Sequence, residues 1–414
     1  MEKLNHSEII TLLLQLSILL ASSRLLAELV RKLKQPGVVG EILAGVLLGP
    51  TFFGAFFPEA YDSLFPAVGN SSIILDGLFT IGVILLLFIA GLEVELPLVW
   101  QQGKRAVYVS LCSLFIPIIV GFGCAYSFPE FFGSVNEEQR VVFALFLGTT
   151  LSITALPVIA RILMDLNIFK SKMGMLIIAS AMIIDILGWF IFTIILSMME
   201  TGEQKIGLWH TIGLTLGFTM IMLTIGKVII DRSLPWINKK LAWPGGVLSL
   251  SMALCFLAAA FTESIGIHSI FGAFIVGIAM GDSVHFSERA KEIVHQFINN
   301  IFAPLFFVSI GLYVNFIDNF NLMQVLAITG LAFVVKVFGA LLGARLGGMN
   351  NNDSLIVGFG MNTHGTLEVI LGTIALSAGL ITEELFVSIV VMVIVTIIFS
   401  APIMKYFIGK SRNE

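Results

Sequence analysis

Charged residues are scarce in this chain. Asp, Glu, Lys and Arg make up 12% of its 414 residues, against about 25% in soluble globular proteins. Hydrophobic residues make up 57%, and they recur in runs of about 20, the length that a helix needs to cross a bilayer. This composition excludes an ordinary soluble domain and predicts an all-α polytopic membrane protein in contact with membrane lipids. The net charge of -4 is spread thinly along the chain, and we expect no nucleic-acid partner.

Cysteine and the common catalytic motifs are also scarce or absent. The only cysteines are Cys112, Cys124 and Cys255, which lie in apolar runs without metal-ligand spacing, and small core residues are the expected role. There is no phosphate-binding loop, metal-ligand cluster or evident nucleophile–base pair. We therefore expect a protein that is not an enzyme, has no cofactor and draws its energy from ion gradients. A selectivity sequence resembling TVGYG is missing as well, which argues against a potassium channel.

The apolar runs predict thirteen transmembrane helices with brief loops between them. The second and the ninth are short and rich in glycine. The expected ranges are 8–30, 37–50, 74–92, 105–127, 140–164, 173–199, 207–230, 244–263, 267–281, 295–313, 322–346, 353–379 and 383–408.

Basic residues are concentrated in alternate loops, those that follow the odd-numbered helices. They are Arg31, Lys32, Lys34, Lys104, Arg105, Lys170, Lys172, Arg232, Lys239, Lys240, Arg289, Lys291, Lys405, Lys410 and Arg412. Such loops face the cytoplasm by the positive-inside rule. The chain is thus predicted to cross a bacterial-type inner membrane, with its N-terminus outside and its C-terminus in the cytoplasm.

Two glycine-rich segments resemble each other. GEILAGVLLG (Gly40–Gly49) and GAFIVGIAMG (Gly272–Gly281) have three glycines in register, and the helix after each ends alike, in FIAGLEV and VSIGLYV. The second and ninth helices cross in opposite senses, as expected for two inverted repeats with a site near the midplane. Chance spacing of small residues at helix contacts is the alternative. In the repeat interpretation, helices one to six and eight to thirteen are the repeats and helix seven links them.

One carboxylate lies in the middle of a span. Asp185 is the only charged residue of the run Met173–Met199, and a charge at that depth costs about 2.5 kcal/mol or more. A carboxylate that holds either a proton or a monovalent cation, and not both, is the minimum for exchange. The alternative is a structural pair with Lys336, the only basic residue deep in a span.

Two predicted helices carry helix-breaking residues and polar side chains. TTLSITALPVIARIL includes Pro157 with the hydroxyls of Thr149, Ser152 and Thr154; GFGMNTHGTLEVILG includes Gly365 with His364 and Glu368. Interrupted helices at corresponding positions are the best sequence indication of a transporter site. We expect the hydroxyls to complete the ion shell of Asp185, and Lys336, Glu368 and His364 to be charge partners in the core. Ordinary interhelical hydrogen bonds and a simple kink at Pro157 remain the alternatives.

Five blocks resemble, in order, those of the cation:proton antiporter 2 family. They are GEILAGVLLGP, LLLFIAGLEVEL, TTLSITALPVIARIL, FTESIGIHSIFGAFIVGIAMG and MNTHGTLEVILG, and they extend over almost the whole chain. The resemblance implies a thirteen-helix sodium/proton-antiporter-like fold with two broken, crossing helices, and usually a homodimer. It implies a dimerisation domain (1–103 and 244–320), a mobile core (104–200 and 321–408) that moves like an elevator, and a linker helix (201–243). Asp185 matches the family's essential aspartate, and Lys336 matches a lysine that many members keep.

Two positions depart from the family's pattern. Ile184 stands where members commonly have a polar residue before the essential aspartate, and His364 stands where related members often have arginine. A single carboxylate favours one-for-one, electroneutral exchange. The resulting prediction is an antiporter of Na⁺ and/or K⁺ for protons. A gated potassium-efflux-type channel and a transport-inactive membrane component are the alternatives.

Overall fold

The computed structural model describes residues 4–33, 37–66, 69–94, 96–166, 168–199 and 208–411. Regular structure in these ranges is helical, apart from one isolated β-bridge between Ser134 and Ile381. Within them, ten helices are long and apolar enough to cross a membrane, and Ser269–Gly281 and Leu367–Ser377 are shorter apolar helices. The predicted all-helical membrane protein is confirmed.

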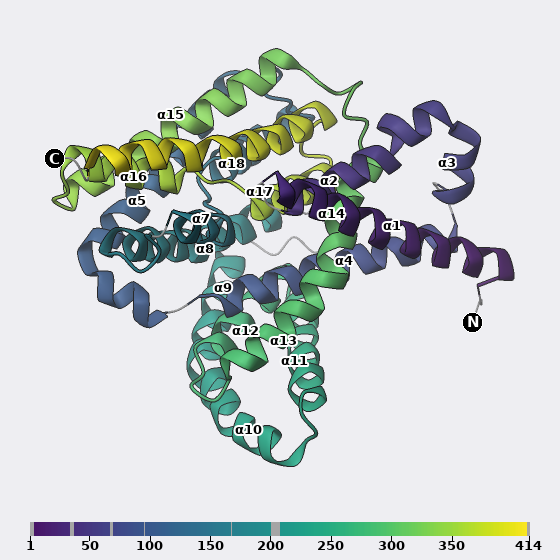
Figure 1. Ribbon diagram of the computed structural model, residues 1–414, viewed down its shortest axis with the longest axis horizontal. Coiled ribbons are helices and arrows are strands. Elements are labelled where there is room, and N and C mark those ends of the chain that lie inside the picture. The colour runs from purple at the N-terminus through teal and green to yellow at the C-terminus, as the bar shows by residue number, and fades with distance from the viewer. Residues whose placement is uncertain are drawn as a thin grey trace. The chain divides into compact units, whose positions relative to one another are not determined.

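The chain forms two compact units, each built from two separate segments (Figure 1). The first unit comprises Met1–Val94 and Trp209–Asn319, and the second comprises Glu95–Leu208 and Phe320–Glu414. Each unit is described on its own below.

The first unit draws its helices from both of its segments. They are α1 (His6–Lys32), α2 (Gly37–Leu48), α3 (Pro58–Leu64), α4 (Asn70–Leu92), α9 (Leu208–Ile221), α10 (Lys227–Lys240), α11 (Gly245–Ser264), α12 (Ser269–Gly281), α13 (Glu288–Phe297) and α14 (Ala303–Tyr313). Single π-helical turns at Met222–Gly226 and Ile298–Phe302 connect α9 to α10 and α13 to α14. Each of these pairs therefore forms one long membrane span. The prediction 207–230 stopped short of the end of α10, because the charged residues and Pro235 of that last part interrupt the apolar run.

Glycines allow two helix pairs of the first unit to pack backbone to backbone. A Cβ atom on Gly45 of α2 would lie 2.9 Å from the carbonyl carbon of Val308 in α14. A Cβ atom on Gly277 of α12 would lie 2.9 Å from the Cα atom of Gly91 in α4. Both distances are shorter than ordinary carbon–carbon contacts, so only glycine fits at these crossings.

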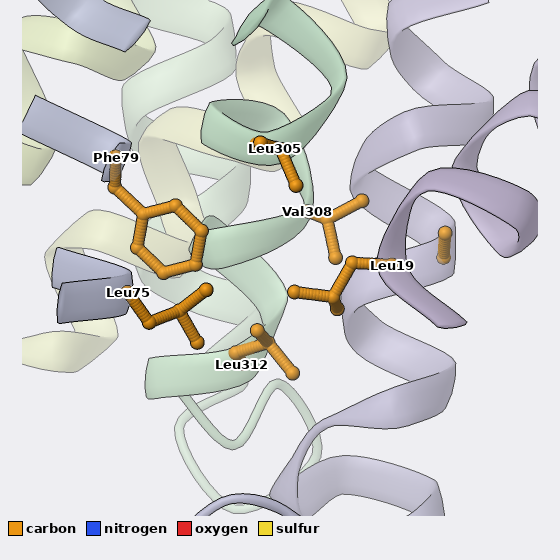
Figure 2. Close-up of a cluster of buried hydrophobic side chains, with 7 residues drawn as sticks. Leu19, Leu75, Phe79, Leu305, Val308 and Leu312 are labelled. Carbon is orange, nitrogen blue, oxygen red and sulfur yellow. The ribbon is translucent and has the colours of Figure 1, made fainter. Parts of the chain in front are cut away.

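A cluster of apolar side chains holds α1, α2, α4 and α14 together. Figure 2 shows Leu19 of α1, Leu75 and Phe79 of α4, and three residues of α14 directed toward one another. Their side chains are almost entirely buried. This cluster fixes the helices around the crossing of α2 with α14.

The second unit contains the two predicted interrupted helices. Its helices are α5 (Leu96–Ser127), α6 (Arg140–Thr150), α7 (Leu156–Asp165), α8 (Lys172–Met199), α15 (Leu322–Leu346), α16 (Asn351–Met361), α17 (Thr366–Ser377) and α18 (Glu383–Ser411). The predicted helix 140–164 is α6 and α7, and 353–379 is α16 and α17, so both predicted interruptions are present. α5 begins before the predicted 105 because a short helix joins it at Gly103, which has a positive φ of 58°.

Small residues also bring the helices of this unit close together. Glycine at 339 of α15 approaches the Cys112 carbonyl oxygen of α5, and glycine at 148 of α6 approaches that of Ile118. Added Cβ atoms would lie 2.7 Å and 2.6 Å from these oxygens. α5 therefore packs tightly against both α6 and α15, next to the interruptions.

Candidate functional site

The two interruptions of the second unit lie against each other. Residues 151–155 separate α6 from α7, and residues 362–365 separate α16 from α17. Three contacts join them: Ala155 N donates to the Thr363 carbonyl oxygen (2.7 Å), Thr154 Oγ1 donates to that of Met361 (2.9 Å), and His364 Nε2 lies 3.4 Å from that of Leu151. Because backbone groups at membrane depth must find protein partners, each break supplies partners for the other.

Local side chains explain why α6 stops where it does. Ser152 Oγ donates to the Thr149 carbonyl oxygen (2.7 Å), and such a bond competes with continuation of the helix. Pro157 lies in the first turn of α7, where a residue without a backbone N–H is tolerated. The predicted interruption is therefore a complete break with a new helix start, and not the simple kink at Pro157 that was the alternative.

The second break needs a glycine for a steric reason. Thr363 Oγ1 donates to the Gly360 carbonyl oxygen (3.0 Å) at the end of α16. A Cβ atom on Gly365 would collide with the Cβ atom of Ala155 in the first break. Only a residue without a side chain lets the two breaks approach this closely.

Four helix ends meet at the crossing, and charged side chains compensate two of them. Helix N-termini carry partial positive charge and C-termini partial negative charge. Glu368 Oε2 accepts a hydrogen bond from Gly365 N (2.8 Å), at the N-terminus of α17. Lys336 Nζ donates to the carbonyl oxygens of Ser152, just after α6, and Ser113 of α5 (3.2 Å). Each charge has the sign that its helix end favours.

Asp185 lies in α8 of the same unit and is 3% exposed. Glu368 and, more weakly, Asp185 lie close enough to Lys336 to interact with it electrostatically. One turn along α8, a Cβ atom on Gly188 would lie 3.1 Å from Ile153 Cγ1, so α8 contacts the first break directly. The structure therefore brings the lone midspan carboxylate, the buried lysine and the broken helices into one polar region.

The predicted hydroxyl residues are all buried around the first break, but their bonding differs. Thr149, Ser152 and Thr154 have no exposed surface. The hydroxyls of Ser152 and Thr154 donate to backbone carbonyls and keep lone pairs for a cation. Thr149 Oγ1 is buried without a hydrogen-bond partner among the described residues. Thr149 is thus the hydroxyl with the most unused bonding capacity.

Asn362 belongs to the same region, although its sequence context did not single it out as an ion ligand. It is fully buried in the second break, and neither Oδ1 nor Nδ2 has a hydrogen-bond partner in the described part of the chain. Its place beside His364 in a glycine-interrupted helix was the available signal. Ser113, whose carbonyl accepts from Lys336, lies within the continuous helix α5 and has no such signal.

The oxygen atoms buried in this region belong to carboxylate, hydroxyl, amide and backbone carbonyl groups. Over the ranges that the structure describes, no three His, Cys, Asp or Glu side chains form a group able to hold a metal. Asp185 with hydroxyl, amide and carbonyl oxygens offers one negative charge and several neutral oxygens.

Comparison with known proteins identifies relatives along almost the full length. Residues 17–406 match the family described as sodium/hydrogen exchanger, transmembrane. The chain is 30% identical over 404 residues to the Na⁺/H⁺ antiporter NhaS4 of Synechocystis sp., covering 97% of this chain and 98% of that protein. It is 30% identical over 397 residues to the Na⁺/H⁺-K⁺ antiporter GerN of Bacillus cereus, covering 95% and 96%.

A solved structure shares the fold. The sodium proton antiporter MjNhaP1 of Methanocaldococcus jannaschii superposes with a TM-score of 0.69 at 17% identity, covering 97% of this chain and 98% of that one. Several Arabidopsis thaliana relatives are longer, and the chain spans about half of their length (49% of one of them).

Proposed function

The chain belongs to the sodium/hydrogen exchanger family and is a monovalent cation/proton antiporter, and on this premise we propose that Asp185 is the group that alternates between a proton and Na⁺ or K⁺. The carrying observation is a buried midspan carboxylate whose helix contacts a crossing of two broken helices. In this proposal the proton and the cation compete for the single negative charge of the Asp185 carboxylate.

The proposed cation shell combines this carboxylate with neutral oxygens. Thr149, Ser152 and Thr154 supply hydroxyl oxygens from the first break, as their sequence pattern predicts. Asn362 adds an amide oxygen from the second, supported by its burial without hydrogen bonds among the described residues. Oxygen ligands of this kind suit hard cations, whereas size selection between Na⁺ and K⁺ depends on how the shell closes.

The proposed role of Lys336, Glu368 and His364 is to balance the partial charges of the helix ends and to hold the two breaks in position against each other. Lys336 donates to the Ser152 carbonyl just after the C-terminus of α6, and Glu368 accepts from Gly365 N at the N-terminus of α17. Each charge is opposite in sign to the partial charge of its helix end. His364 bridges to Leu151 of the other break. In this proposal Pro157 and Gly365 shape the crossing and do not contact the ion.

We propose thirteen membrane segments arranged as two inverted repeats. The thirteen are the ten long spans together with the broken pairs α6–α7 and α16–α17 and the short helix α12. The glycine contacts support the repeats: Gly45 of α2 packs on α14, and its repeat equivalent Gly277 of α12 packs on α4. Each repeat thus places its second helix against the third helix of the other.

We propose that the first unit is the dimerisation domain of a homodimer and that the second is the mobile core. All ion-site candidates lie in the second unit, whose interrupted helices would carry the ion in an elevator-type movement. The segment Trp209–Ile237, which lies within the predicted linker 201–243, belongs to the first unit.

Exchange is proposed to be electroneutral, because Ile184 leaves Asp185 as the single carboxylate at this point of α8. One proton then leaves for each cation that binds. The proposed setting is a bacterial inner membrane with the N-terminus outside, from the loop distribution of Lys and Arg.

The test is proton flux in proteoliposomes with a preset pH gradient, after addition of Na⁺, K⁺ or Li⁺ outside. Wild-type protein should collapse the gradient with at least one cation, and Asp185→Asn should not. Asp62→Asn, the same change on the exposed face of α3, should transport normally. Retained exchange in folded Asp185→Asn would disprove the assignment, and cation flux without proton movement would indicate the channel alternative.

A further inference from the structure

A hollow seam separates α9 and α10 from α11 in the first unit. Two cavities follow each other along it, of about 500 Å³ beside α9 and about 200 Å³ beside α10. Leu254 of α11 lines both of them. They form one groove, called the α9–α11 groove below, whose walls are the membrane spans Trp209–Ile237 and Gly245–Ser264.

Glycines line this groove, whereas elsewhere in the same unit they allow helices to pack closely. Small residues normally let membrane helices approach each other, as Gly45 does in the same unit. Gly213 and Gly217 of α9 line the larger cavity, and a Cβ atom on either would meet no atom within 4 Å. The groove is therefore space left between two spans and not a packed crossing.

The lining of the groove is apolar and has few groups that could bind water. Its only hydroxyl groups, on Ser233 and Ser251, donate to the Ile229 and Val247 carbonyl oxygens of their own helices (2.8 Å and 2.6 Å). An ordered water needs two or more polar partners, and this lining offers only the remaining lone pairs of these two hydroxyls. A hydrocarbon chain is the group that such a surface at membrane depth favours.

One end of the groove is basic. Ile237 lines the smaller cavity, and the exposed Lys239 and Lys240 follow it in the last turn of α10. The Arg289 guanidinium lies 5.6 Å from the centre of the Trp243 ring, which is 41% exposed and follows α10. Tryptophan at a span end is typical of the lipid headgroup level. We call Arg232, Lys239, Lys240 and Arg289 the basic end.

Two acidic groups near this end are already engaged. Asp231 accepts a hydrogen bond from the Ser283 hydroxyl, and Asp282 pairs with Lys227. The four residues of the basic end are exposed. Positive charge at the mouth of an apolar groove matches a molecule with a hydrocarbon tail and an anionic head.

We propose that the α9–α11 groove binds an anionic phospholipid, with an acyl chain in the groove and the phosphate at the basic end. The bound lipid would fill the space between the linker segment and α11. Each basic residue near an anionic lipid surface strengthens binding about fivefold, so headgroup charge decides which lipid is retained. The proposal is independent of the ion site in the second unit.

The experiment is native mass spectrometry of the delipidated full chain in detergent, after addition of phosphatidylglycerol or zwitterionic phosphatidylcholine. Gly213→Leu/Gly217→Leu fills the larger cavity, and leucine is a better helix former than glycine. Its control is Gly330→Leu in α15, where an added Cβ also meets nothing. Lys239→Gln/Lys240→Gln removes charge at the basic end, and Lys170→Gln/Lys172→Gln, at exposed positions of the second unit, is its control.

Wild-type protein and both controls should retain phosphatidylglycerol in preference to phosphatidylcholine. The groove-filling variant should lose the retained lipid, and the basic-end variant should bind phosphatidylglycerol about 25-fold more weakly, about fivefold per charge. Wild-type lipid binding by the groove-filling variant would overturn the proposal, as would equal loss in Gly330→Leu. Unchanged lipid with a shift from dimer to monomer would also overturn it and indicate a second copy of the chain in the groove.

Discussion

Alanine at Gly45 or at Gly277 should destabilise the first unit, because each glycine is in backbone contact with another helix. The added Cβ would lie 2.9 Å from the Val308 carbonyl carbon in one case and 2.9 Å from the Gly91 Cα atom in the other. The nearest atom is a helix carbonyl oxygen at both positions, that of Val308 and that of Phe88. Backbone atoms cannot rotate away, so the helices themselves must separate.

The size of the effect follows from these distances. Carbon atoms prefer separations of about 3.5–4.0 Å, so each helix pair must open by roughly 0.6–1.1 Å and lose about a quarter to a half of its dispersion energy there. Overpacking of this kind costs about 1–3 kcal/mol, while alanine gains about 1 kcal/mol over glycine as a helix former. Gly213→Ala has only the gain, since its Cβ meets nothing. Gly45→Ala and Gly277→Ala should therefore each be about 1–3 kcal/mol less stable than Gly213→Ala.

The assay is thermal unfolding of the purified protein in detergent, followed by loss of the monodisperse peak in size-exclusion chromatography. Gly45→Ala and Gly277→Ala should unfold below Gly213→Ala, and by similar amounts because they occupy equivalent crossings. Unfolding of either variant at or above the temperature of Gly213→Ala would refute the packing argument. A decrease in only one of them would contradict the proposed equivalence of the two repeats.

Two further predictions concern the crossing of the broken helices. Thr154→Val removes the donor to the Met361 carbonyl oxygen (2.9 Å) and leaves that buried group unsatisfied, which should cost about 1–3 kcal/mol in the same unfolding assay; Thr154→Ser keeps the hydroxyl, and equal loss in both variants would contradict this role. Glu368→Ala removes the acceptor for Gly365 N (2.8 Å) and should cost about 0.5–2 kcal/mol, as for other lost helix caps. Glu368→Gln keeps an acceptor oxygen and should lose less, so equal destabilisation of the two variants would show that the charge and not the cap matters.

Much of the helical architecture could be predicted from the sequence, because membrane spans need long apolar runs whatever their neighbours are. The breaks were predicted for a local reason too, since Pro157 and Gly365 are poor residues for a helix interior. The predicted helix boundaries were wrong where contacts between helices set the helix ends. The polar end of α10 continues beyond its apolar run, and the short helix α3 (Pro58–Leu64) had no hydropathy signal.

The bonding of the site could not be predicted, because its partners come from distant parts of the chain. Lys336 was expected to pair with a carboxylate, and the carboxylates of Glu368 and Asp185 do interact with it electrostatically. Its hydrogen bonds, however, go to the carbonyl oxygens of Ser113 and Ser152. The bond from Ala155 N to the Thr363 carbonyl oxygen has no trace in the sequence either. Backbone groups are the same in every residue, so residue types cannot indicate which of them will pair.

The amino-acid sequence by itself determined the class of protein, the interrupted helices and Asp185 as the residue to test, because burying charge and breaking a helix in hydrocarbon are costly whatever the fold. Only the tertiary structure decided that the two breaks bond each other, that Lys336 and Glu368 compensate helix ends, and that Asn362 lies buried among them. These features depend on distances between segments far apart in the chain, and the close packing that sets those distances arises only when the helices assemble.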